Sequence, residues 1–146
     1  MRLIILIIGL ILLATTVLGG PSQSDSSDFV NKGTVVFHIE GFDSIKGKAM
    51  CAMFTQKKWL GRGYGDTARI VSRKATCEFK DIPYGIYGIA AFHDEDNNDN
   101  FNTFLGVPTE SGCFSNNALA TFGPPSFKKA RFKHEKPETV LFCKIS

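Results

Sequence analysis

The sequence predicts an all-β protein, a small antiparallel β-sandwich with one long ordered loop. Apolar residues alternate with polar ones along several short segments, Gly- and Pro-rich turns separate these segments, and no stretch has a convincing helical period. The chain of 146 residues suits one domain, and its 13 phenylalanines can fill a core. The net charge of +3 is too small to indicate nucleic-acid binding, and the chain has no basic stripe with interleaved aromatic residues.

The first twenty residues differ in composition from the rest. Arg2 supplies one positive charge, an almost wholly apolar run follows from Leu3 to Leu18, and Gly19 and Gly20 end it. This order is typical of a secretory signal peptide, so residues 1–20 are expected to be removed on export. A signal anchor is the alternative, although the run is shorter than the roughly twenty residues that span a membrane comfortably. No stable membrane span is expected after cleavage, and the protein is predicted to be secreted, or periplasmic in a bacterium.

The four cysteines all lie beyond this segment: Cys51, Cys77, Cys113 and Cys143. An even number of cysteines behind a secretory signal indicates two disulfides. Three pairings are possible. We favour Cys51–Cys77 with Cys113–Cys143, because Cys51 and Cys77 both face inward on strands that can lie next to each other. A zinc site is the alternative, but the cysteines form no C-x-x-C pair.

The domain is expected over residues 33–146, after a polar, Ser-rich and flexible leader at residues 21–32. The first strand is predicted at Thr34–Glu40, where every second residue is apolar and faces the core. The second is predicted at Lys48–Phe54, whose alternation places Cys51 on the inner face.

A loop is predicted at Gln56–Asp66, because it contains three glycines. Two short strands follow, at Ala68–Ser72 and Ala75–Lys80. Pro and Gly residues place a turn at Asp81–Gly85. The strongly apolar Ile86–Phe92 suits the centre of the sandwich.

The segment His93–Pro137 is long and shows little sign of regular structure, and loops of this length in compact domains are usually functional or disordered. Its many aromatic residues indicate that it packs on the sandwich. Within it, Ser126 is expected to cap one helical turn that ends at Arg131, and Ser115 and its two neighbouring asparagines are expected to cap backbone groups. The strand Thr139–Ile145 closes the domain.

This long segment begins with oxygen-bearing side chains at alternate positions: Asp94, Asp96, Asn98, Asn100 and Asn102. Calcium takes six to eight oxygen ligands, and a curling loop with this spacing can supply them, as an EF-hand loop does. The pattern therefore predicts a calcium site, with Glu110 able to reach in. Asp99 stands at the sixth position, where an EF-hand loop has glycine, and Leu105 stands at the twelfth, where it has glutamate. The alternative is a solvated polar turn.

The sequence shows no catalytic constellation, so the protein is predicted to be a secreted, non-catalytic binding or structural module and not an enzyme. Its expected partner is an extracellular protein, a glycan or the cell surface. A hydrolase that uses His93, Asp94 and Glu110 is a second hypothesis, although no nucleophile motif accompanies them. A small-ligand carrier is a third, and it would require a pocket of several hundred Å³.

Two surface features complete the set of candidate sites. Trp59 lies on the Gly-rich loop, and a basic cluster contains Lys128, Lys129 and Arg131. Together they form a candidate contact patch, although a solvated face is the simpler interpretation of the basic cluster. Of the other histidines, His38 is expected on the outer face of an edge strand and His134 on the basic surface.

Four blocks of sequence resemble the DUF2141 family of bacterial proteins, a domain of unknown function: IPYGIYGIAAFHDEDNND, FLGVPTE, FSNNA and FGPPSFKKARF. The resemblance covers residues 33–146. It implies an exported protein with a transthyretin- or prealbumin-like β-sandwich, and it implies no catalytic residues. Asp99 stands where the family usually has glycine, and Asn102 where it has aspartate, which lowers the charge of the expected calcium site. Cys113 replaces a family glycine, which fits a disulfide peculiar to this branch.

Overall fold

The computed structural model describes residues 31–145, so the signal-peptide prediction and nearly all of the predicted leader lie outside the described residues. Most of the described chain is in strands, and the all-β prediction is confirmed. The strands are β1 (Lys32–Glu40), β2 (Lys48–Phe54), β3 (Tyr64–Ala68), β4 (Lys74–Pro83), β5 (Gly85–Asp94), β6 (Thr103–Phe104), β7 (Val107–Pro108), β8 (Gly112–Phe114), β9 (Phe132–His134) and β10 (Glu138–Lys144). Three short helices complete the set: η1 (Gln56–Lys58), η2 (Ser115–Asn117) and α1 (Phe127–Ala130).

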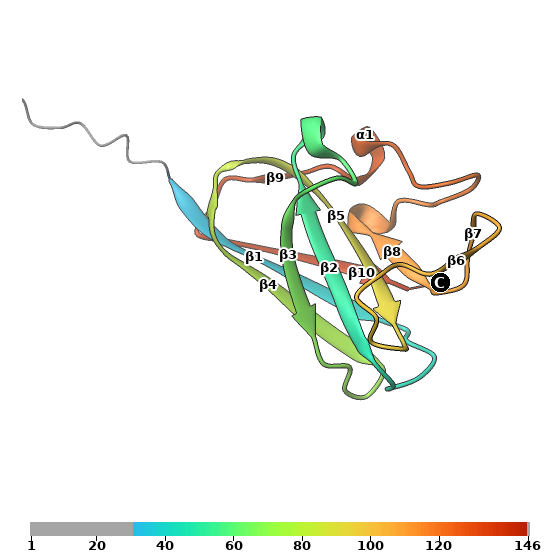
Figure 1. Ribbon diagram of the computed structural model, residues 1–146. Coiled ribbons are helices and arrows are strands. Elements are labelled where there is room, and N and C mark those ends of the chain that lie inside the picture. The colour runs from blue at the N-terminus through green and yellow to red at the C-terminus, as the bar shows by residue number, and fades with distance from the viewer. Residues whose placement is uncertain (1–30, 146) are drawn as a thin grey trace, which may run out of the picture.

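Two sheets pack face to face (Figure 1). One has the strand order β10-β1-β4, and the other has the order β3-β2-β5-β8, with β9 also pairing with β5. The strand alternation predicted from the sequence sets this packing, because every second side chain points between the sheets. Phe37 of β1, Met53 of β2 and Ile89 of β5 are fully buried there. The sequence predicted antiparallel pairs, but β1 and β10 are parallel.

Both predicted disulfides are present, and both connect one sheet to the other. Cys51 of β2 is bonded to Cys77 of β4, and Cys113 of β8 is bonded to Cys143 of β10. The pairing prediction is therefore confirmed. Among residues 31–145, the buried core side chains lie between Val35 and Ile145, and so do the four cysteines. A chain that begins at Pro21 would keep every one of these contacts. Within residues 31–145, no helix has the length and the apolar composition to cross a membrane.

The prediction of a strand at Ala68–Ser72 is wrong. The strand in this part of the chain is β3, at Tyr64–Ala68, and the residues after Ala68 lead into a turn closed by the bridge between Val71 and Lys74. The sequence favoured a loop there on account of its glycines. At Gly63, however, a Cβ atom would meet the Met53 carbonyl oxygen at 2.2 Å. This glycine marks a close approach between two backbones at the start of a strand, which local sequence does not distinguish from a turn.

The long segment contains β6 to β9, so it is more regular than predicted. Ser115 fixes it to the sandwich: its buried hydroxyl accepts a hydrogen bond from the Ile89 N–H (2.9 Å) and donates one to the Ala130 carbonyl (2.5 Å). This confirms the expected role for Ser115. Ser126 does precede α1, but its side chain makes no capping hydrogen bond.

The prediction that His38 lies on an edge strand and the prediction that His134 lies on the surface are both wrong, whereas His38 does lie on the outer face of its strand. His38 lies on β1, which is the central strand of its sheet, because β10 and β4 flank it on both sides. His134 is fully buried instead of lying on the basic surface. Its Nδ1 atom is 2.8 Å from the Thr139 hydroxyl, and its ring packs edge-on against Tyr84. Both errors have the same cause, because the neighbours of a strand in the folded protein, which decide whether it is an edge strand and which side chains it buries, are not encoded in its own residues.

Candidate metal centre

Asp94 is the last residue of β5, and it lies where the strand runs into the acidic loop, which we define as residues 94–110. Its side chain points away from the core, since the inward positions of β5 end with His93. It is nevertheless completely buried, with 0% exposure, because the loop folds back over it. The Asn98 N–H donates to Asp94 Oδ1 (3.0 Å), and the Asp99 N–H donates to Oδ2 (3.1 Å).

The loop can curl in this way because two of its residues adopt left-handed backbone conformations. Asn97 has φ 58°, and Asp99 has φ 63°. Asn and Asp tolerate this region better than other non-glycine residues. Asp99 stands at the sixth position of the loop, where an EF-hand calcium loop has glycine. Asp99 therefore supplies the backbone conformation expected of that glycine, while it adds a carboxylate.

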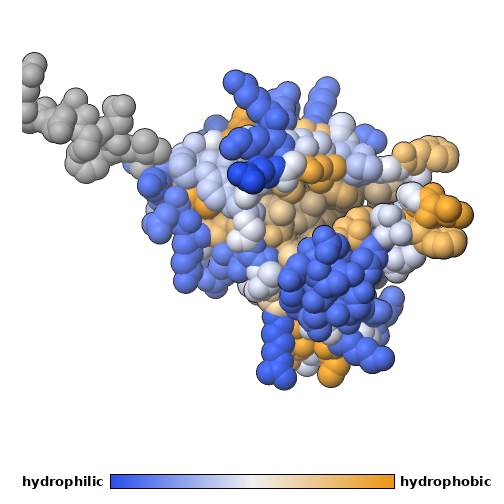
Figure 2. Space-filling model, viewed as in Figure 1, coloured by the Kyte–Doolittle hydropathy of each residue, from blue (hydrophilic) through white to orange (hydrophobic). Residues whose placement is uncertain are grey.

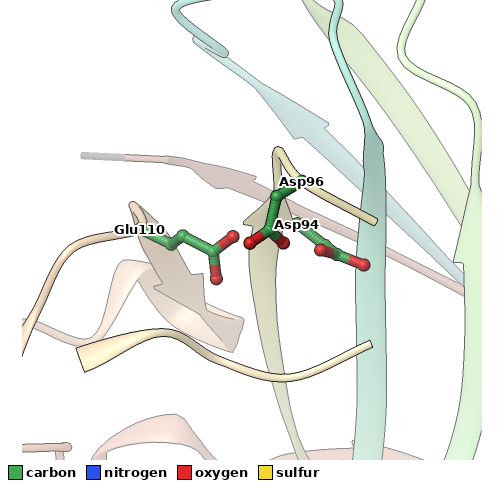
Figure 3. Close-up of side chains that lie close together, drawn as sticks. All are labelled: Asp94, Asp96 and Glu110. Atoms are coloured by element: carbon green, nitrogen blue, oxygen red, sulfur yellow. The ribbon is translucent and has the colours of Figure 1, made fainter. Parts of the chain in front are cut away.

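Three carboxylates meet at this loop. Asp94, Asp96 and Glu110 each offer an oxygen, and these oxygens all lie within 4.8 Å of one another. Figure 3 shows Asp96 and Glu110 facing each other, with Asp94 behind them at the end of its strand. Glu110 is fixed by two backbone amides, those of Glu95 (3.2 Å) and Asn102 (3.0 Å). It therefore closes the loop from its far end.

The predicted asparagine ligands have different positions. Asn98 and Asn102 lie beside the carboxylates, and the side-chain amide of each donates to Asp96 Oδ2 (2.9 and 3.0 Å). The Asn102 side-chain oxygen accepts a hydrogen bond from Asn98 (2.8 Å). Asn100 turns away and donates to the Asn98 carbonyl (2.7 Å). Four of the five predicted ligands therefore lie at the cluster: Asp94 and Asp96 join Glu110 in it, and Asn98 and Asn102 lie beside it. It does not include the Asn100 side chain.

Lys48 is the cation at this site. Its ammonium lies 3.5 Å from Asp94 Oδ2 and forms a second, shorter ion pair with Asp99. Its pKa is raised above 10.5, chiefly by the hydrogen bond with Asp99, which outweighs desolvation. Burial alone would raise the pKa of Asp94, but the Asp99 and Asn98 amides and Lys48 outweigh it and hold this pKa below its ordinary value of 3.8. Asp94 is therefore ionised although it is buried.

His93 faces the opposite way from Asp94 and is also buried, with 2% exposure. Its Nε2 atom is 2.8 Å from the Lys46 carbonyl, and its Nδ1 atom is 3.6 Å from a Glu95 oxygen. Its ring packs edge-on against Phe42. Both nitrogens are thus directed at protein groups, and the ring has no access to a substrate. The hydrolase hypothesis required an exposed His93 in a common pocket with Asp94 and Glu110, so this geometry gives it no support.

The candidate contact patch is also not a single exposed surface. The Trp59 ring is half-buried over β5, where it contacts Phe54, Phe114 and Phe127. Its indole N–H donates to the Pro125 carbonyl (2.9 Å). Trp59 therefore joins the long segment to the sandwich. Lys128, Lys129 and Arg131 are exposed on α1 and just after it, as the sequence suggested.

The fold and the cluster together define a disulfide-linked β-sandwich domain with a group of carboxylates at the end of a central strand. Oxygen atoms of this kind are suitable ligands for hard cations. The chain belongs to the DUF2141 family, described as an uncharacterized protein conserved in bacteria, which matches residues 37–141. The resemblance seen in the sequence is therefore confirmed. Comparisons with curated proteins and with solved structures find no match.

Proposed function

We propose that this protein is an exported, non-catalytic binding module whose acidic loop is ordered by a calcium ion. Asp94, Asp96 and Glu110 would supply the charged ligands, and the Asn102 side-chain oxygen would add a neutral one after a rotation of its amide. The gathering of three carboxylates within 4.8 Å is the observation that carries the proposal. The expected partner is an extracellular protein, a glycan or the cell surface.

The charge balance of the loop supports a cation. Residues 94–110 contain five carboxylates, at Asp94, Glu95, Asp96, Asp99 and Glu110. Lys48 neutralises Asp94 and Asp99 only, so Asp96 and Glu110 face each other without a cation among the described residues. Two carboxylates so close repel each other at neutral pH. A calcium ion between them would remove this repulsion and fix both ends of the loop.

The two disulfides support an exported location. Such bonds persist in oxidising compartments and are rare in the cytosol. They are compatible with an extracellular or a periplasmic protein, and the apolar run at residues 3–18 provides the route for export.

Calcium titration of the oxidised chain that begins at Pro21 tests the proposal. Calorimetry should show saturable binding, with a dissociation constant of about 10⁻⁴ to 10⁻³ M, as for other extracellular modules. At ten times that concentration, calcium should stabilise the fold by roughly 1.4 kcal/mol and raise the thermal midpoint by roughly 5 °C.

Isosteric variants show whether these carboxylates bind the ion. Asp96→Asn and Glu110→Gln each remove one charge and keep the shape of the side chain, so each should weaken binding by about tenfold or more. Glu135→Gln removes a carboxylate that pairs with Lys133 next to the start of β5, at the other end of that strand from the acidic loop, so it is the matched control and should bind as the native chain does. Unchanged calorimetric heats and an unmoved midpoint at millimolar calcium would refute the metal site and leave a structural polar turn.

A further inference from the structure

Two loops of the long segment end in exposed apolar side chains. The first is the β6–β7 hairpin, where Phe104, Leu105 and Val107 are exposed, and the second is the loop between η2 and α1, where Leu119 and Phe122 are exposed. We call these residues the apolar tips. Figures 1 and 2 show both loops projecting from the same side of the molecule, each with apolar residues on it. Phe122 is fully exposed, and Leu105 is 89% exposed, so neither stabilises the core.

The backbone conformation of Leu105 is a second reason why a leucine at this position does not stabilise the fold. Leu105 and Gly106 form the two-residue turn of the hairpin, with φ 52° and 81°. Turns with two positive φ values favour Asn, Asp or Gly, and leucine is strained there. Leucine at this position is therefore unfavourable in two ways: its backbone has a positive φ, and its apolar side chain is exposed to water. Such a combination indicates a role outside the fold.

The hairpin is held firmly at its base. The Thr109 N–H donates to the Asn102 carbonyl (2.9 Å), and Phe101 packs edge-on against Phe92 of β5. The second loop is anchored by Ser115 at one end and by α1 at the other. Both tips are thus presented in fixed positions, which lowers the entropy lost when they bind a surface.

The charge pattern around the tips identifies the kind of surface. The first tip projects from the acidic loop, whose carboxylates at residues 94–99 lie at its base and are partly paired with Lys48, whereas between Asn100 and Phe127 the sequence contains a single charged residue, Glu110. Basic residues follow at once, with Lys128, Lys129, Arg131 and Lys133 all exposed. The second tip, which leads directly into these lysine and arginine residues, matches a lipid bilayer, in which apolar side chains enter the acyl region and the cations meet the phosphates.

We propose that the apolar tips dock this protein on a lipid membrane. A protein partner is the less suitable occupant, because protein interfaces require a complementary and usually continuous surface. The two tips are separate, convex projections, and a fluid bilayer adapts to them without complementary shape. The proposal does not depend on calcium.

Vesicle binding tests this proposal on the oxidised chain from Pro21, in EDTA, so that the apolar run at residues 3–18 and calcium do not contribute. The probes are vesicles of phosphatidylcholine, with and without phosphatidylglycerol. The native chain should sediment with both, and more tightly with the anionic vesicles. Leu105→Asn with Phe122→Ser should weaken binding by roughly 100-fold, about tenfold for each side chain. Val71→Ser, at an equally apolar and 60% exposed site in the β3–β4 turn, should bind as the native chain does.

A spectroscopic variant reports insertion directly. Phe122→Trp should give fluorescence that shifts to the blue and is quenched by brominated lipid, a change that Trp59 alone does not give. Absence of binding to both vesicles, or equal binding by the native chain and the double variant, would overturn the proposal. Self-association that depends on the tips in the absence of lipid would overturn it in favour of a protein interface. Phe122→Ser alone, which lies outside the acidic loop, should keep the native response to calcium, so failure of the metal site would be seen separately by calorimetry.

Discussion

Asp94 shows how a single residue can depend on the whole loop around it. Its carboxylate is fully buried, yet two backbone amides and the Lys48 ammonium stabilise its charged form. The amides come from residues four and five positions further along, so the charge of Asp94 and the curl of the loop support each other. Neither partner alone would make a buried carboxylate acceptable.

This arrangement predicts a pH-dependent contribution to stability. Because the folded pKa of Asp94 lies below 3.8, its ionisation stabilises the native state above that pH, and the contribution is lost as the pH falls through the folded pKa. Asp94→Asn should therefore lower the free energy of unfolding by about 1–3 kcal/mol at neutral pH. Urea unfolding in EDTA from about pH 7 to pH 3 should show this difference begin to shrink near the unfolded pKa of 3.8, because there the unfolded chain takes up a proton that native Asp94 does not.

Asp43→Asn is the matched control for that experiment, since Asp43 is an exposed carboxylate paired with the exposed Arg73. Its effect should stay within about 0.5 kcal/mol at every pH. A difference between native chain and Asp94→Asn that persists undiminished in acid would show that Asp94 acts through packing and not through its charge.

At the scale of elements, the contact between β5 and the Trp59 loop holds the long segment in place. Gly88 lies on the outer face of β5, directly beneath the indole ring. A Cβ atom at Gly88 would lie 2.7 Å from Trp59 Cζ3 and 3.4 Å from Phe127 Cδ2. The glycine therefore leaves the space in which an aromatic cluster covers the sheet, and a side chain there would displace that cluster.

Gly88→Ala should lower stability by about 1–3 kcal/mol, because the indole must move and its contacts with Phe54 and Phe127 are strained. Trp59 is the single tryptophan of the chain, so its emission reports the displacement without ambiguity. Gly65→Ala on β3 is the matched control, since a Cβ there meets nothing within 4 Å. An unchanged unfolding midpoint and emission spectrum in Gly88→Ala would mean that the ring is not confined as described.

At the scale of the whole molecule, the two disulfides join the sheets at opposite sides of the sandwich. Cys51–Cys77 links β2 to β4, and Cys113–Cys143 links β8 to the last strand, β10. Each closes a loop of similar length in the unfolded chain, with sequence separations of 26 and 30 residues. The second also ties the long segment, and with it both apolar tips, to the C-terminal strand.

Removing either bridge by a pair of Cys→Ala substitutions should cost about 3.5 kcal/mol, from the loop entropy returned to the unfolded state. Equilibrium urea unfolding of Cys51→Ala/Cys77→Ala and Cys113→Ala/Cys143→Ala measures the two costs separately. They should be nearly equal, because the loops are nearly equal. A bridge whose loss leaves the midpoint unchanged would contradict its structural role.

The sequence predicted the sandwich well because strand alternation is a local pattern. Residues such as Val35, Phe37 and Ile39 reveal their inward face through spacing alone. The placement of β3 failed because Gly63 was interpreted as a loop residue, although its small size serves a neighbouring strand. In the candidate site, alternation drew attention to Asp94 and Asp96, which the folded loop brings together with Glu110, but it also included Asn100, which the folded loop turns away.

The sequence by itself determined the all-β class, the inward faces of the main strands and the family. Each of these follows from spacing or residue type along a short stretch of chain. Tertiary structure alone decided that β1 and β10 are parallel, that His134 is buried, that Glu110 joins two aspartates across the loop, and that the apolar tips project into solvent. These features depend on contacts between residues far apart in the chain, and such contacts leave no periodic signal in the sequence.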